Sequence, residues 1–135
     1  MEHLIDSALW IDAVRPKSSA ALKRQTDGWI THPDAVSCEP VTFEMLRNAK
    51  LSERPGLQAR LATLPLLPTP RTLWADASLL GQRCRDRGFT IGAFDLLIAT
   101  VALAHEVEVI TFDADYSLIA QAEPKLRVQA LARAT

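Results

Sequence analysis

Short apolar runs alternate along the chain with longer stretches whose apolar residues recur at helical spacing. The runs have the length of buried strands, and the stretches have the length of helices that pack one face on a core. Strands are predicted at residues 3–5, 35–38, 107–111 and 126–128, with an edge-like strand at 65–68 between two prolines. Helices are predicted at residues 8–14, 18–25, 41–50, 52–64, 72–87, 92–105 and 116–121, and Asp27-Gly28 is expected to end the second of them.

The stretch at residues 92–105 differs from the others because it is apolar on nearly every side. Between Phe94 and Ala104, only Asp95 and Thr100 interrupt the apolar residues. A helix of this kind is buried between other elements, and an aspartate is almost never fully buried unless something pairs with it. The pattern therefore indicates that Asp95 has a partner that compensates its charge.

The order of the predicted elements indicates the fold class. Strands that alternate with helices favour an α/β domain with a largely parallel sheet. A chain of 135 residues can bury a sizeable core without disulfides or a structural metal. We predict a single α/β domain spanning residues 1–135, with a mostly parallel sheet of four to five strands.

Composition and charge indicate which partners and which cellular compartment suit the chain. The net charge of -1 creates no strong overall field toward nucleic acid or membrane, so any nucleic-acid site must be local. Cys38 and Cys84 are isolated in the sequence, which favours small core residues in a reducing cytosol over a disulfide framework. No segment has the pattern of a signal peptide or 18 consecutive apolar residues, and we expect a cytoplasmic protein that makes no membrane contact.

Four acidic residues from distant segments are expected to meet at one edge of the sheet. Sites in open α/β sheets form beyond the carboxyl ends of the strands, and both Asp6 and Asp113 directly follow predicted strands. Asp95 begins the helix that leads into the penultimate strand, and Glu44 lies on the helix after the second strand. Packed carboxylates cannot all remain ionised without a cation, and ligand sets made of oxygen atoms suit Mg²⁺ or Mn²⁺.

Two of these acids also have a purely structural explanation, and two have a rival nearby. Asp6 could cap the following helix, and Glu44 could lie on a solvated helix face. Glu39 is the rival of Glu44, but it falls at a helix start, where a carboxylate favours the dipole without further purpose. Asp113 directly follows its strand and is preferred to Asp115, which could cap the next helix.

Other chemistries lack their motifs in this sequence. The three histidines show neither HExxH nor a His/Cys spacing, so a zinc site is not expected. No GxSxG motif is present to supply a serine nucleophile. The absence of GxxxxGK(S/T) and GxGxxG disfavours P-loop and Rossmann nucleotide binding.

Four segments together resemble the successive motifs of PIN-domain proteins, and the closest match is the VapC-type toxin of bacterial toxin–antitoxin pairs. The segments are Leu4-Ile-Asp6-Ser7 with Leu9-Trp-Ile-Asp12, Pro40-Val-Thr-Phe-Glu44-Met-Leu-Arg47-Asn-Ala49, Phe94-Asp95-Leu-Leu-Ile-Ala99, and Val109-Ile-Thr-Phe-Asp113-Ala-Asp115-Tyr116. The resemblance implies a three-layer α/β/α fold and a Mg²⁺- or Mn²⁺-dependent endoribonuclease. It also implies a homodimer, a higher toxin–antitoxin assembly in some cases, and neutralisation by a small cognate VapB-type antitoxin. By matching motifs, the acidic-site positions are Asp6, Glu44, Asp95 and Asp113.

The resulting hypothesis is hydrolysis of RNA phosphodiester bonds by a metal-activated water. Asp6 and Asp95 would ligate the metal directly, whereas Asp113 and Glu44 would ligate through water or orient the attacking water. Ser7 could hydrogen-bond a ligand carboxylate or a metal-bound water.

Cationic and aromatic residues offer candidate contacts to the RNA. Arg47, Lys50 and Arg54 follow Glu44 and could meet the RNA backbone, although solvated cations on a helix have the same pattern. Trp10 could stack on a base, but its apolar neighbours favour core packing.

Two other function classes fit parts of the pattern. A PIN-like module that only holds RNA or a protein partner would not need to keep all four acids, whose charges repel one another. A Mg²⁺-binding phosphoacceptor or small phosphatase would need an acid pair after the first strand and a nearby lysine, and Asp6-Ser7 supplies one acid there.

Overall fold

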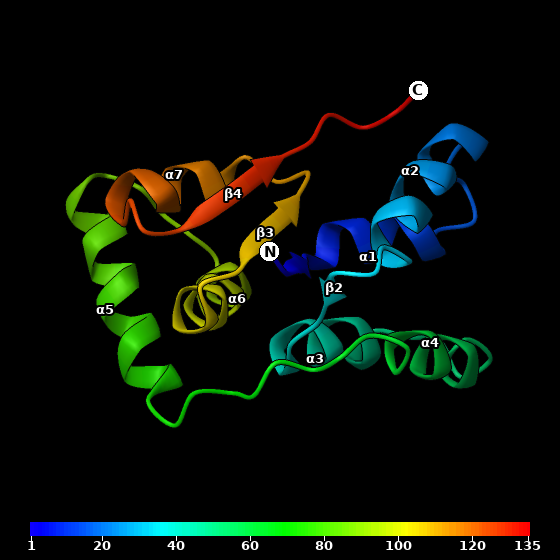
Figure 1. The fold of residues 1–135 in the computed structure, drawn as a ribbon, viewed down its shortest axis with the longest axis horizontal. Helices are drawn as coiled ribbons and strands as arrows, with labels where there is room; N and C mark the ends of the chain where they lie inside the picture. The colour runs from blue at the N-terminus through cyan, green and yellow to red at the C-terminus, as the bar shows by residue number, and fades with distance from the viewer.

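The computed structural model describes residues 1–135 as seven helices and four strands. Figure 1 shows their arrangement in space. In chain order, the elements are β1 (His3–Ile5), α1 (Ser7–Val14), α2 (Ala20–Ile30), β2 (Ala35–Val36), α3 (Glu39–Arg47), α4 (Arg54–Leu61), α5 (Leu73–Asp86), α6 (Ala93–His105), β3 (Glu108–Thr111), α7 (Asp115–Ala122) and β4 (Arg127–Ala130).

The four strands form one sheet in the order β2-β1-β3-β4, and every pair is parallel. The register places Leu4 beside both Val36 and Val109, so buried aliphatic side chains line up across the middle of the sheet. The parallel sheet predicted from the alternation of strands and helices is thereby confirmed. The segment at 65–68 adds no fifth strand, since it contributes only a single bridge between Leu66 and Ser37.

Helices cover both faces of the sheet. Parallel crossovers are right-handed, so the helices of the β1–β2 connection lie on one face and those of the β2–β3 and β3–β4 connections lie on the other. Figure 1 shows α1 and α2 together on one side of the sheet, with α5, α6 and α7 on the opposite side. Most contacts agree with this division, since α1 packs against α2, whereas α6 packs against α3, α5 and α7. Helix α3 also contacts α1.

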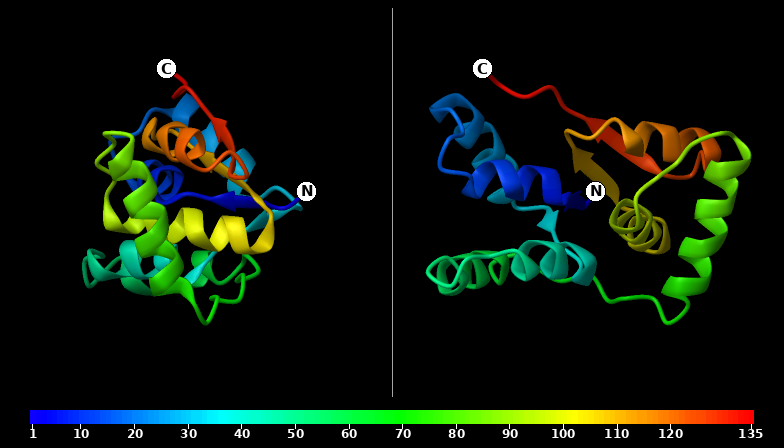
Figure 2. Two further views of the ribbon diagram at one scale, coloured as in Figure 1. Left: turned by 90° about the vertical axis from the view of Figure 1, so that its left-hand side faces the viewer. Right: turned by 180° about the vertical axis from the view of Figure 1, so that it is seen from behind.

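The apolar helix predicted at residues 92–105 is α6, and it lies in the middle of the core. Ile98, Ala99, Val101 and Ala102 are completely buried. The left-hand view of Figure 2 shows α6 running alongside the strands, between them and neighbouring helices. A helix enclosed in this way has a fixed position, and the residue near its beginning, Asp95, is fixed with it.

The second helix continues past its predicted end. Asp27-Gly28 does not terminate α2, which extends to Ile30. Ile30 is buried in the core, and the carboxylate of Asp27 pairs with Arg60 of α4. The burial of the last turn outweighs the helix-breaking tendency of a single glycine, which is about 1 kcal/mol.

The structure bears on the predicted absence of a membrane-spanning helix and on the predicted burial of Trp10. No helix has the length and apolar character needed to cross a membrane. Trp10 is completely buried, so it packs in the core and is not available to stack on a base.

The C-terminal residues cross from β4 toward α1 and α2 (Figure 1). Arg133 donates from Nε to Oδ2 of Asp12 at 2.6 Å, and its guanidinium carbon lies 4.7 Å from the centroid of the Phe112 ring. Gln25 of α2 makes hydrogen bonds to the backbone of both Ala132 and Ala134. Asp12 is only 4% exposed, so Arg133 is the main partner of a buried charge.

We expect Arg133→Ala to destabilise the fold by about 1–2 kcal/mol, because it leaves the carboxylate of Asp12 with only the distant Arg15 at 3.9 Å. Urea unfolding followed by circular dichroism measures this difference. The matched control is Arg85→Ala, which removes an exposed arginine of α5 and should change stability by less than about 0.5 kcal/mol. Equal stabilities of the two variants would contradict the assignment.

Candidate functional site

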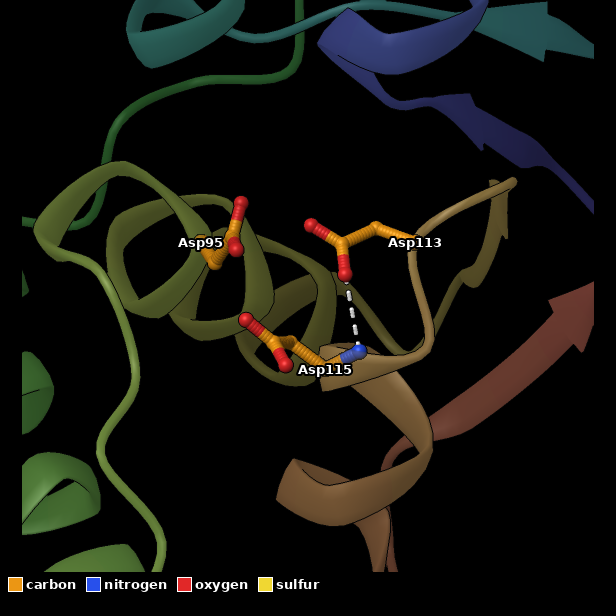
Figure 3. Close-up of side chains that lie close together, drawn as sticks. All are labelled: Asp95, Asp113 and Asp115. Atoms are coloured by element: carbon orange, nitrogen blue, oxygen red, sulfur yellow. Dashed lines mark hydrogen bonds between the residues drawn. The ribbon is translucent and has the colours of Figure 1, made fainter.

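Three carboxylates lie together at one end of the sheet. The side chains of Asp95, Asp113 and Asp115 each offer an oxygen atom, and these atoms all lie within 4.8 Å of one another. Figure 3 shows the three groups turned toward one another, from the beginning of α6, the segment after β3 and the beginning of α7. All three side chains are partly exposed, so a ligand in solution can reach them.

The fold explains why these segments meet. The strands are parallel, so the residues that follow β1 and β3 emerge at the same edge, where α/β proteins form their sites. Asp113 comes two residues after the end of β3, and Asp95 lies in the first turn of the helix that enters β3 from that edge. A helix N-terminus favours nearby negative charge by about 0.3–1 kcal/mol.

The segment between β3 and α7 is held by its own hydrogen bonds. The backbone N–H of Asp113 donates to Oγ1 of Thr111 at 2.8 Å, and the N–H of Asp115 donates to Oδ1 of Asp113 at 2.9 Å. Asp113 therefore accepts the N–H at the start of α7 and takes the capping role that the sequence pattern allows for Asp115. The carboxylate of Asp115 caps nothing and faces the other two acids.

Asp6 lies beside this group and is only 2% exposed. Its Oδ2 accepts a hydrogen bond from the hydroxyl of Thr111 at 2.7 Å, and its Oδ1 accepts one from the hydroxyl of Tyr116 at 2.9 Å. The Tyr116 hydroxyl also lies 3.3 Å from Oδ1 of Asp95. Asp6 occupies the N-cap position of α1, but its side chain makes no capping hydrogen bond there, because its two oxygens accept hydrogen bonds from Thr111 and Tyr116.

Burial and mutual repulsion raise the proton affinity of the group. Burial raises the pKa of Asp95 to about 7, with further contributions from the negative charges of Asp6 and Asp113. Burial also raises the pKa of Asp6, against the lowering effect of the hydrogen bonds from Thr111 and Tyr116. The pKa of Asp115 is raised by desolvation and by the charge of Asp113. In the absence of a cation, Asp6, Asp95 and Asp115 therefore bind a proton more readily than a free carboxylate does.

Glu44 is not part of the carboxylate group. It lines a cavity of about 440 Å³ between α1, α3 and α4, together with Ile11, Met45 and Leu57. The rival acid Glu39 accepts a hydrogen bond from the hydroxyl of Thr69. Of the four acids predicted to meet, Asp95 and Asp113 lie together and Asp6 lies beside them. Glu44 lines the separate cavity between α1, α3 and α4.

A model of the PIN domain family matches residues 4–122, from the second residue of β1 to the end of α7. The chain belongs to the PIN domain family.

One relative of this PIN domain is the ribonuclease VapC6 of Mycobacterium tuberculosis. The two chains are 32% identical over 98 residues, which cover 69% of this chain and 76% of the relative. The same values hold for VapC6 from the strains CDC 1551 / Oshkosh and ATCC 25618 / H37Rv.

Solved structures share the fold at lower identity. VapBC2 from Rickettsia felis, bound to a DNA fragment from its promoter, has a TM-score of 0.71 at 16% identity and covers 98% of this chain and 100% of its own. FitAB bound to the IR36 DNA fragment has a TM-score of 0.72 at 19% identity, with 98% and 99% covered. These similarities confirm the α/β PIN fold expected from the sequence motifs.

The donor set of this PIN domain fits a hard divalent cation. The three grouped residues offer only carboxylate oxygens, which suit Mg²⁺ or Mn²⁺, and neither histidine nor cysteine belongs to the group. Magnesium sites in proteins use one or two carboxylates together with water and substrate phosphate, and the partial exposure of the group allows both.

Two hydroxyl residues of the site were not predicted from the sequence. Thr111 ends β3 and Tyr116 is the second residue of α7, and both hydroxyls donate to Asp6. Both residues lie in the same motif as Asp113 and carry a hydroxyl group, which is the signal that the sequence offers. The packing of β3 and α7 decides that these hydroxyls point toward Asp6. Ser7 had been considered as a hydrogen-bonding group, and its Oγ is buried without a protein partner.

Proposed function

We propose that this PIN domain is the toxin of a toxin–antitoxin pair and acts as a Mg²⁺- or Mn²⁺-dependent endoribonuclease. The observation that carries the proposal is a group of three carboxylates with no protein cation to balance it. The salt bridges of the structure involve other acids, Asp12, Asp27 and Glu123. A site that gathers negative charge at an accessible sheet edge, without a lysine or arginine, is suited to a divalent cation.

The residues of the site have different roles in this proposal. Asp95 and Asp113 hold the cation, Asp115 is available as a third oxygen donor, and Asp6 completes the site from the buried side. A bound divalent ion lowers the pKa of its water ligand and offsets charge on the phosphoryl oxygens. Glu44 is proposed to act through water, as the family resemblance implies.

The residues around Asp95 offer contacts for RNA. The guanidinium of Arg47 lies 4.9 Å from the centroid of the Phe94 ring, which directly precedes Asp95 in the sequence. This contact holds a positive charge of α3 against the first turn of α6, and we propose that it meets a phosphate of the bound RNA. Of the cations predicted to meet RNA, Arg47 is the one with this placement, while Arg54 donates to the carbonyl of Ala49.

A VapB-type antitoxin is the proposed protein partner. The comparison structures include VapBC toxin–antitoxin complexes, and VapC6 is named as a ribonuclease. We also propose a homodimer, in line with the exposed aromatic side chains of Phe43 and Trp74 that a second copy could cover. The product of a short reading frame beside this gene should co-purify with the chain and suppress its cleavage of RNA.

The direct test is incubation of the purified protein with bacterial total RNA in the presence of Mg²⁺, followed by sequencing of the new RNA ends. We expect cuts at a small number of positions. DNA of the same sequence as the cleaved RNA is the matched control and should remain intact. An intact RNA pool after incubation with folded protein and Mg²⁺, and again with Mn²⁺, would contradict the ribonuclease assignment.

A further inference from the structure

Tyr116 is the only tyrosine of the chain, and it lies completely buried in the second position of α7. Its hydroxyl oxygen is 2.9 Å from Oδ1 of Asp6 and 3.3 Å from Oδ1 of Asp95. These two acids are far apart in the sequence, since Asp6 follows β1 and Asp95 lies in the first turn of α6. A single phenol therefore bridges two residues of the candidate site.

The bridge leaves Asp6 with both oxygens fixed. A phenol has one hydrogen to donate, and the shorter distance assigns it to Asp6. The other carboxylate oxygen of Asp6 accepts the hydroxyl hydrogen of Thr111 at 2.7 Å. Both donors come from the β3–α7 segment, which also carries Asp113 and Asp115. The same segment thus supplies acids to the site and orients the acid that β1 supplies.

Packing alone does not require the hydroxyl. A phenylalanine at this position would fill the same volume, but it would remove the side-chain donor to the buried Oδ1 of Asp6. Asp6 and Asp95 would then face each other without the intervening group, and Asp95, the more exposed of the two, would be free to turn toward solvent. Residues that orient metal ligands typically contribute 10–100-fold to metal affinity.

We propose that the hydroxyl of Tyr116 is a positioning group that holds Asp6 and Asp95 in the orientation required to bind the divalent cation. This inference rests on the proposed function, since it concerns the same metal site. Tyr116 does not bind the metal or the RNA, and it acts through the two carboxylates that it bridges.

The first test is the affinity of purified Tyr116→Phe for Mn²⁺, measured by isothermal titration calorimetry. We expect a loss of about 10-fold relative to the unmodified chain, with unchanged circular dichroism. The matched control is Thr26→Val, which removes another buried hydroxyl, one that donates to a carbonyl of α2, and should keep the original affinity. A folded Tyr116→Phe that binds Mn²⁺ as tightly as Thr26→Val would overturn the inference.

The second test needs no substitution at the site. Selective ¹³C labelling of tyrosine gives one ζ-carbon resonance, because the chain contains a single tyrosine. Saturation with Mg²⁺ should shift this resonance as the hydrogen bond to Asp6 changes, and substoichiometric Mn²⁺ should broaden it. A resonance that neither shifts nor broadens, in a chain shown by calorimetry to bind the metal, would contradict the bridging role.

These measurements separate the inference from the function on which it rests. An unmodified chain that binds no Mn²⁺ in calorimetry contradicts the proposed metal site, and the positioning role falls with it. A chain that binds Mn²⁺ and cleaves RNA, but whose affinity is insensitive to Tyr116→Phe, keeps the proposed function and loses only the inference.

Discussion

Asp95→Asn is expected to reduce Mg²⁺-dependent RNA cleavage by about 1,000-fold while the chain remains folded. The substitution keeps the size of the side chain and leaves a carbonyl oxygen that can lie beside the Tyr116 hydroxyl. It removes a negative charge from the three-carboxylate group, where the cation would stabilise the charge that develops on the phosphate. A metal-free site has less repulsion without this charge, so the variant should unfold at the same temperature as the parent or at a higher one.

The measurement is the cleavage rate of a mapped RNA substrate, with thermal unfolding recorded on the same preparations. Asp86→Asn is the matched control, because Asp86 is an exposed aspartate at the end of α5 with no hydrogen-bond or ion-pair partner. It should retain the full rate. A folded Asp95→Asn that cleaves RNA as fast as Asp86→Asn would remove Asp95 from the site.

Much of the fold could be predicted from the local spacing of apolar residues. The strands at 3–5 and 107–111 are short apolar runs rich in aliphatic residues, and their burial on both faces is what a parallel sheet requires. The predicted end of α2 at Asp27-Gly28 was wrong because Ile30 is buried in the core, and a local pattern does not show this burial. The segment at 65–68 has the apolar residues of a strand, but its prolines leave room for only one bridge to Ser37.

Those parts of the candidate site that depend only on the order and direction of the strands could be predicted from the sequence. Asp6 and Asp113 follow parallel strands, so their meeting at one edge depends only on chain order and strand direction. The grouping of Asp115 with Asp95 depends instead on the rotation of α7 about its axis, which packing of the buried face of that helix decides. The placement of Glu44 depends in the same way on the rotation of α3 about its axis. That rotation turns Glu44 toward the cavity beside α4 and not toward the three grouped carboxylates.

Removal of divalent metal is expected to abolish cleavage and to make the stability of the chain depend on the protonation of Asp95. Excess EDTA should leave no measurable cleavage, and Mg²⁺ added above the EDTA concentration should restore it. The affinity for Mg²⁺ should rise from pH 6 to pH 8, because burial and the neighbouring acids raise the pKa of Asp95 to about 7 and a proton competes with the cation. Cleavage that persists in EDTA would contradict the metal mechanism itself.

The sign of the stability change follows from the protons bound in each state. The carboxyl of Asp95 has a pKa of about 7 in the folded chain, against an ordinary value of 3.8 when unfolded. Between these values the folded chain holds a proton that the unfolded chain has released, so the contribution of Asp95 to stability is fully present below about pH 4 and is lost as the pH rises through 7. Because the side chain is partly exposed, we expect a loss of about 1–2 kcal/mol from this group.

Urea unfolding in EDTA at several pH values measures this loss, and Asp95→Asn isolates the contribution of Asp95 to it. The variant has no proton to release at this position, so its stability should fall less between pH 4 and pH 7 than that of the parent chain. Saturating Mg²⁺ at pH 8 should stabilise the parent, by about 2.7 kcal/mol at 100 times the dissociation constant, and should stabilise the variant much less. Identical pH dependence in parent and variant would mean that the charge of Asp95 is already balanced within the protein, and the need for a cation at this site would disappear with it.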